Sequence, residues 1–169
     1  ADGSSGLAII DISDPTNPGT PVYKDTNGSA EKVAISGNYA YVADGASGLA
    51  IIDISNPSSP GTPVYRDTNG SAYGVTISGN YAYVVDVNSG LAIIDISDPT
   101  NPGSPIYKDT NGVTKTFENH GLAISGNYAY LADGTSGLAI ISTNVSDLTD
   151  ASGNRATLTL SSPGAAGSL

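Results

Sequence analysis

The sequence predicts an all-β fold of β-propeller blades, each a sheet of four antiparallel strands in a repeat of about 42 residues. The first observation is that Ser-Gly-Leu-Ala-Ile-Ile occurs four times. Its glycines Gly6, Gly48 and Gly90 are 42 residues apart, and Gly137 follows after 47. The second is that each unit holds four short apolar runs separated by Gly, Asn and Pro turn signals. A β-solenoid or a β-sandwich fits this repeat length and its turns less well.

The unit beginning at Val33 shows the four strands that we expect in order. Residues 33–36 form the inner strand, which we expect to be the shortest because it lines the crowded axis. Gly37-Asn38 is a two-residue hairpin signal, and residues 39–43 form the second strand. Residues 49–54 form the third strand, and residues 62–67 the fourth. The proline and the charges of this fourth strand are typical of an outer edge, where an unpaired ladder must be protected.

The two middle strands are predicted to be buried on both faces. Leu-Ala-Ile-Ile does not alternate apolar with polar residues, as a half-buried strand would. The second strand carries two tyrosines on one face, which we expect to pack against the neighbouring blade. Stacking of these rings on a sugar is the weaker alternative. The pairs are Tyr39/Tyr41, Tyr81/Tyr83 and Tyr128/Tyr130.

Length and repeats predict one domain over residues 1–160 and a flexible Ser/Gly/Ala-rich tail over residues 161–169. Ala156 to Leu160 alternates and is a candidate fourth outer strand. The opening Ala1-Asp2-Gly3 matches Ala43-Asp44-Gly45, so the sequence starts within a repeat. We therefore expect a processed product or a piece of a longer protein. The repeats are expected near residues 1–42, 43–84, 85–131 and 132–160.

Composition limits the partners. The net charge of −10 argues against binding to nucleic acid or to an anionic membrane, because both require a basic face. No apolar stretch is long enough to span a membrane, so we expect no direct membrane insertion. Cysteine is absent, and only 13% of residues are charged, which is more typical of an extracellular β-protein than of a cytosolic enzyme.

The repeat also resembles a known family. Tyr-Ala-Tyr-Val-Ala-Asp-Gly-x-Ser-Gly-Leu-Ala-Ile-Ile-Asp-Ile-Ser-Asp-Pro-x-x-Pro is similar to the LVIVD repeat, and the resemblance covers residues 1 to about 141. It implies a β-propeller fold and a place on secreted or surface proteins of bacteria and archaea. It carries no shared catalytic motif. Ser142 replaces the expected Asp, so the resemblance weakens at the last outer strand.

Three repeated polar motifs have a structural and a functional interpretation. Asp25-Thr26-Asn27-Gly28 and its copies at Asp67 and Asp109 could begin a Ca²⁺ loop, but the remaining ligands are missing and a turn is the preferred interpretation. Asp11, Asp53 and Asp95 are expected to accept backbone N–H groups of the Pro-rich loop, with a metal role as the weaker alternative. Asn27, Asn69 and Asn144 match the glycosylation sequon, which a chain rich in Asn and Ser also produces by chance.

Residues 113–120 are the only irregular insertion, five residues longer than the equivalent connection. They form the candidate ligand-binding site, since propellers often place specificity in such loops. A surface loop that has drifted in sequence is the alternative. A lone His is a poor zinc site, and no nucleophile elbow or singular carboxylate pair accompanies it, so we expect no enzyme and no required cofactor. The candidate ligand-binding residues are Lys115, Phe117, Glu118, Asn119 and His120.

The leading functional hypothesis is a non-catalytic extracellular or cell-surface structural module, for adhesion or for self-assembly into a filament, appendage or coat. The alternative is a lectin-like or protein-binding propeller that uses residues 113–120. Residues 1–25 supply only the outer half of a blade, which leaves a strand edge beside Leu7, Ile9 and Ile10 open to another copy or to further repeats of a longer chain. Removal of the missing strands with the rest of a longer protein explains this edge equally well.

Overall fold

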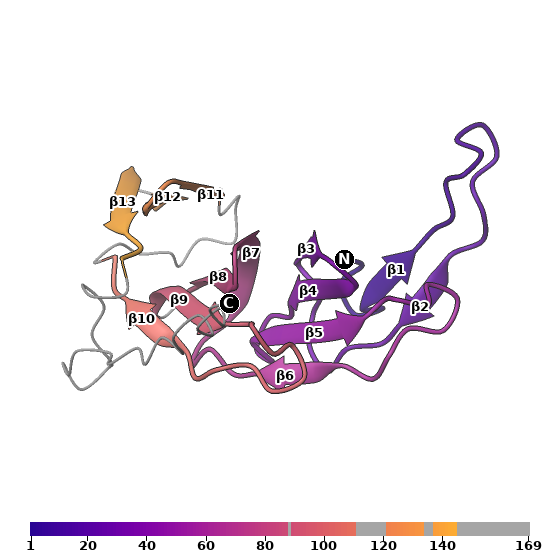
Figure 1. Ribbon diagram of the computed structural model, residues 1–169, viewed down its shortest axis with the longest axis horizontal. Coiled ribbons are helices and arrows are strands. Elements are labelled where there is room, and N and C mark those ends of the chain that lie inside the picture. Colours follow the sequence, from indigo (N-terminus) through magenta and orange to yellow (C-terminus); the bar gives the residue numbers. More distant parts are fainter. Residues whose placement is uncertain (88, 111–120, 134–136, 145–169) are drawn as a thin grey trace, which may run out of the picture.

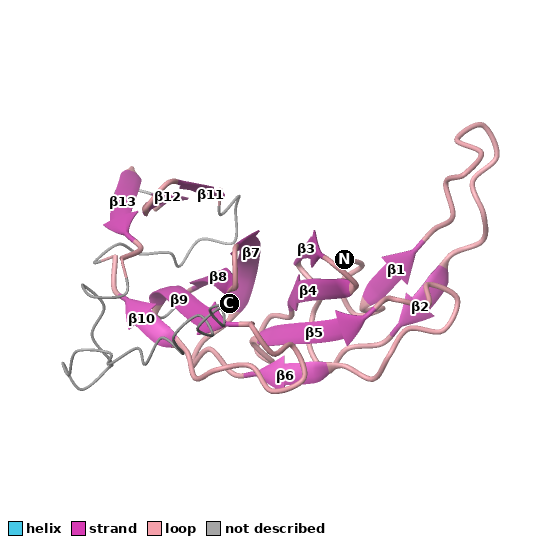
Figure 2. Ribbon diagram, viewed as in Figure 1, coloured by secondary structure: helices cyan, strands magenta, loops and turns pink. Residues whose placement is uncertain are grey.

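The computed structural model describes residues 1–87, 89–110, 121–133 and 137–144. Over these residues the regular structure is entirely β, and every strand pairing is antiparallel (Figure 2). The predicted all-β fold class is therefore confirmed, and two of the described sheets have the predicted four antiparallel strands. Four sheets follow one another along the chain, and we number them 1 to 4.

Each sheet is built in chain order, so that every strand pairs with the next one in sequence. Sheet 1 has two strands, β1 (Leu7–Ile9) and β2 (Val22–Lys24). Sheet 2 has four, β3 (Lys32–Ser36), β4 (Tyr39–Ala43), β5 (Leu49–Asp53) and β6 (Val64–Arg66). Sheet 3 has β7 (Ala72–Ser78), β8 (Tyr81–Asp86), β9 (Gly90–Asp95) and β10 (Ile106–Lys108). Sheet 4 has β11 (Leu122–Ser125), β12 (Tyr128–Ala132) and β13 (Leu138–Ser142).

The predicted hairpin between the inner and second strands is confirmed. Ser36 pairs with Tyr39, so only Gly37 and Asn38 lie in the turn. Gly37 has a φ of 54°, a left-handed conformation that glycine adopts without a steric penalty. The same two-residue turn recurs in sheets 3 and 4, where Ser78 pairs with Tyr81 and Ser125 with Tyr128.

The expectation that the inner strand is the shortest is wrong. The inner strands β3, β7 and β11 have five, seven and four residues, whereas the outer strands β2, β6 and β10 have three each. Proline precedes each outer strand and cannot donate to the sheet ladder, which limits how far pairing extends. The described sheets do not close into a ring, so the crowding expected at a closed axis is not found among them.

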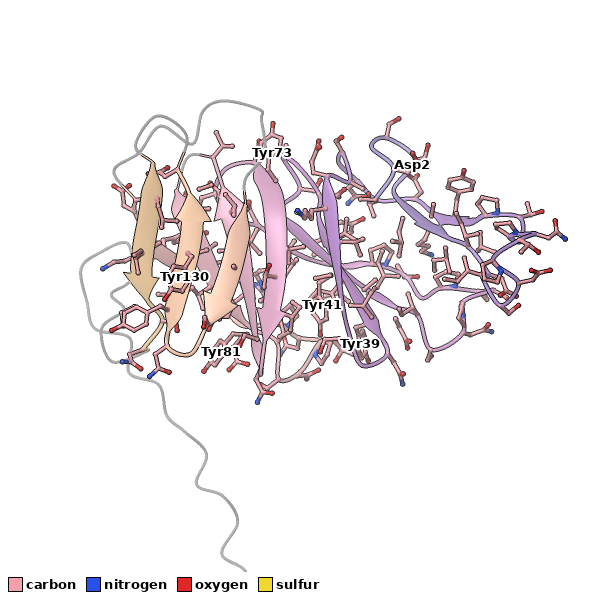
Figure 3. The ribbon with its side chains drawn as sticks, turned by 90° about the horizontal axis from the view of Figure 1, so that it is seen from above. Asp2, Tyr39, Tyr41, Tyr73, Tyr81 and Tyr130 are labelled. Carbon is pink, nitrogen blue, oxygen red and sulfur yellow. The ribbon has the colours of Figure 1, made fainter. Side chains whose placement is uncertain are left out.

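The sheets stack face to face, and an apolar core fills each of the three junctions (Figure 3). Each sheet has a forward face toward the next sheet and a backward face toward the preceding one. At the junction of sheets 2 and 3, the forward residues Tyr41, Leu49 and Ile51 pack with the backward residues Val84 and Ile94. Tyr39/Tyr41 and Tyr81/Tyr83 therefore pack at junctions, as predicted, whereas Tyr128 of the third pair is exposed.

The array is open. Sheet 1 lies at one end of the long axis and sheet 4 at the other, and the described sheets do not close into a ring (Figure 1). The loop from β1 to β2 extends from the sheet 1 end (Figure 1). Ala156 to Leu160, predicted as a fourth outer strand, and the tail over residues 161–169 lie outside the described residues.

Candidate functional site

The connections between consecutive sheets hold the most deeply buried polar groups of the molecule. Asp44 follows β4, and its carboxylate is completely buried. Its Oδ1 accepts a hydrogen bond from Thr26 Oγ1 at 2.6 Å, and its Oδ2 accepts one from the backbone N–H of Gly28 at 2.9 Å. Thr26 and Gly28 belong to the segment that joins sheet 1 to sheet 2. Both hydrogen bonds are charge-assisted because they are accepted by a carboxylate. Asp44 therefore holds the connecting segment against sheet 2.

The same Thr–Asp residue pair recurs at the next two connections, with different hydrogen bonds. Thr68 and Asp86 are both buried, but Asp86 Oδ1 accepts the backbone N–H of Ser89 at 2.9 Å. Among the described residues, the Thr68 hydroxyl has no hydrogen-bond partner. At the third connection Thr110 Oγ1 donates to Asp133 Oδ1 at 3.4 Å. The three connections thus share a Thr–Asp residue pair, but the two residues hydrogen-bond to each other only in the first and the third connection.

Backbone pairing adds to each of these connections. Gly3 and Ala30 exchange two backbone hydrogen bonds of 2.9 and 3.0 Å, which joins sheet 1 to the segment entering sheet 2. Gly45 and Ala72 make the equivalent pair at 2.9 and 3.1 Å. In these two connections the turn before the third strand therefore pairs with the chain at or just before the inner strand of the following sheet. These bonds and the buried Thr–Asp contacts make neighbouring sheets one continuous structure.

The sequence interpretation missed these buried aspartates. In the sequence, Asp-Thr-Asn-Gly indicates a turn, and no role is assigned to Asp44, Asp86 or Asp133. The available signal was their joint recurrence. A threonine in the connection precedes its aspartate by 18 residues in the first bonded pair and by 23 residues in the last. The recurrence of the same two residue types in the same two segments of each repeat is the signal that the segments lie close together.

The second aspartate series accepts backbone N–H groups of the Pro-rich loops, as the sequence predicts. The carboxylates of Asp11, Asp53 and Asp95 accept the backbone N–H two residues later, each at 2.8 Å. These bonds lower the pKa of the exposed Asp11 and Asp53 carboxyls, because backbone donors stabilise the charged form. The backbone carbonyl of each aspartate also accepts the N–H of the glycine that ends the loop, again at 2.8 Å. Each aspartate therefore closes one Pro-rich loop.

The turn interpretation of Asp-Thr-Asn-Gly also has structural support. Asp67 Oδ1 accepts the backbone N–H of Asn69 at 3.0 Å, and Asn69 has a left-handed φ of 63°. Among the described residues, no three carboxylates or histidines gather closely enough to hold a metal ion. The Ca²⁺ expectation stays a prediction. Asn27, Asn69 and Asn144 are exposed, and their glycosylation is likewise a prediction.

The candidate ligand-binding residues Lys115, Phe117, Glu118, Asn119 and His120 lie outside the described residues.

The predicted assembly edge beside β1 lies within the described residues. Leu7 and Ile9 pack on the backward face of sheet 2, so β1 turns these side chains inward. Ile10 follows the end of β1 and is exposed. Among the described strands β1 pairs only with β2, and a hollow of about 610 Å³ lies beside Ile9, Ile10 and Pro57.

The repeat sequence matches a known family. The model of the LVIVD repeat matches residues 1–22, 27–64, 69–106 and 119–151, which is most of the chain. The chain belongs to the LVIVD repeat family. The matched segments of this LVIVD protein begin and end near the connections that carry the buried Thr–Asp pairs. A comparison with curated proteins gives no match. None of the described residues forms a helix that could cross a membrane.

Proposed function

We propose that this LVIVD array is a non-catalytic structural module of an extracellular or cell-surface protein, used for adhesion or for self-assembly into an appendage or coat. The observation that carries the proposal is the use of polar groups within the array. The aspartates of the two repeated series bond to groups that hold connections and loops in place. A carboxylate engaged in this way supports architecture, whereas catalysis needs one asymmetric, preorganised site.

The partner that this function requires is another copy of the chain, or further LVIVD repeats of a longer one. The low content of charged residues and the net charge of −10 support an extracellular setting and oppose nucleic acid as a partner. An array of stacked sheets adds material along one axis, which suits a filament or a coat better than a globular receptor.

Light scattering on residues 1–169 over a wide concentration range tests this proposal, with electron microscopy of the same samples. We expect the mean mass to rise with concentration and elongated particles to appear. A well-folded chain that stays monomeric throughout would contradict self-assembly. A glycan array that shows binding lost in Phe117→Ala would instead assign the chain to the carbohydrate-binding class.

A further inference from the structure

The exposed large apolar side chains of the described residues are not scattered over the surface. All of them belong to the two ends of the array or to the gap left by the incomplete sheet 1. A monomeric protein normally scatters such residues singly, so this concentration indicates a contact surface. The residues are Ile10, Ile12, Tyr23, Ile35, Tyr128, Leu138 and Ile140.

The forward face of sheet 4 repeats the forward face of sheet 2 residue for residue. Tyr128, Tyr130, Ala132, Leu138 and Ile140 stand in the register positions of Tyr39, Tyr41, Ala43, Leu49 and Ile51. In sheet 2, Leu49 and Ile51 are 0% and 1% exposed because sheet 3 covers them. In sheet 4, Leu138 and Ile140 are 62% and 59% exposed. The face has the composition of a junction but no sheet against it among the described residues.

The backward face of sheet 1 is also uncovered, although its equivalent in sheet 3 is buried in a junction. Ile10 and Ile12 stand where sheet 3 has Ile94 and Ile96, which pack against sheet 2. Ile12 is 69% exposed, whereas Ile96 is 5% exposed. Tyr23 is also exposed, although its equivalent Tyr65 packs into the preceding junction and accepts a hydrogen bond from the Asn27 N–H at 3.0 Å.

These two exposed faces are of the two kinds that meet at every junction inside the chain. Each of the three internal junctions joins a forward face to a backward face. The exposed faces continue this series as one more junction of the same kind. The two faces lie at opposite ends of the long axis in both views, so they cannot meet within one chain (Figures 1 and 3).

We propose that the forward face of sheet 4 docks on the backward face of sheet 1 of a second copy. This proposal rests on the self-assembly proposed above and names the surface that performs it. β13 stacks on β1 of the partner as a third strand on a third strand, with Leu138 and Ile140 against Ile10 and Ile12. The contact is heterologous, so it can propagate into a filament or close into a ring of several copies.

Two single substitutions and one matched control test the contact. Ile140→Glu places a charge on the forward face of sheet 4, and Ile12→Glu places one on the backward face of sheet 1. Both side chains are exposed in one copy, so neither change should harm folding. Thr62→Glu adds the same charge at an exposed position of the loop between β5 and β6, which belongs to neither end sheet. We expect both end variants to be monomeric at concentrations where the wild type and Thr62→Glu assemble.

Mixing the two end variants tests the direction of the contact. Ile140→Glu retains an intact backward face and Ile12→Glu an intact forward face. An equal mixture therefore has one functional junction and should give a heterodimer that grows no further, measured by light scattering and by mass spectrometry of the intact complex. Dimerisation of Ile12→Glu alone would show forward-to-forward contact and overturn the proposal.

The remaining outcomes separate this inference from the proposed function. If the wild type and both end variants assemble equally, assembly stands and the surface proposed here is wrong. If the wild type stays monomeric, self-assembly fails and this contact fails with it; the end faces then belong to segments outside these residues. Circular dichroism of each variant confirms that loss of assembly is not loss of fold.

Discussion

Thr26 and Thr68 are the same residue at equivalent connections, yet their hydroxyls have different surroundings. Thr26 donates to the buried Asp44 carboxylate at 2.6 Å, whereas the Thr68 hydroxyl is buried without a hydrogen-bond partner among the described residues. A hydrogen bond to a charged group stabilises more than a neutral one, and a buried hydroxyl without a partner destabilises. The two positions therefore predict opposite responses to one substitution.

Thr26→Val should lower the free energy of unfolding by about 2 kcal/mol, because it removes a charge-assisted bond from a buried carboxylate. Thr68→Val keeps the shape, loses no hydrogen bond and should change stability by less than about 0.5 kcal/mol or increase it. Urea unfolding followed by circular dichroism measures both. Equal losses in the two variants would show that Thr68 also bonds in solution.

The sequence predicted some polar roles and missed others for a physical reason. Asp11 bonds to a backbone group two residues away, a local pattern that a short stretch of sequence contains. Asp44 bonds to a residue 18 positions away, in a segment that only the stacking of sheets brings near. Long-range contacts of this kind are visible in sequence only as a shared recurrence.

At the level of the elements, the turn between the second and third strands tolerates change less than the hairpin before it. Gly48 has a φ of 74°, and a Cβ there would lie 2.4 Å from the backbone oxygen of Arg66. Gly37 has a φ of 54°, but a Cβ there would meet nothing within 4 Å. Both positions strain an L-residue, and only the first also produces a clash with main chain.

Gly37→Ala should therefore cost roughly 1 kcal/mol of stability, the penalty of a left-handed conformation alone. Gly48→Ala should cost clearly more, since the outer strand β6 must move to relieve the clash. Thermal unfolding of both variants provides the comparison, and the hairpin variant is the matched control. A smaller loss for Gly48→Ala would mean that β6 is held loosely.

The sequence located these elements well but not their relative lengths. Gly-Asn turns and the Leu-Ala-Ile-Ile run placed most strand boundaries, because both are local signals. The short inner strand was expected from a closed ring, in which the axis is crowded. In the open array β7 extends over seven residues. The candidate ligand loop at residues 113–120 departs from the repeat, so the pattern gave no structure for it.

For the whole molecule, the junction tyrosines predict sensitivity to alkaline pH. Burial raises the pKa of Tyr41, Tyr83 and Tyr107, because the phenolate is poorly solvated in the junctions. A raised pKa in the folded state means that folding favours the protonated form. Stability should therefore be complete below the ordinary tyrosine pKa of about 10 and fall as the pH rises above it.

Ultraviolet titration of tyrosinate tests this expectation. The junction tyrosines should ionise late, together with loss of the β signal in circular dichroism. Tyr83→Phe removes one junction phenol and should shift the alkaline unfolding midpoint upward. A single titration step with no delayed group would contradict burial of these rings in solution.

The near-identity of the junctions has a consequence for how such a chain changes over generations. The forward faces carry similar residues at equivalent positions, and so do the backward faces, so one repeat can stand in for another at a junction. Duplication or loss of one repeat at the DNA level adds or removes a single junction and leaves the others intact. The length of the array is therefore a property that recombination can adjust in whole steps, without new compatible residues having to arise.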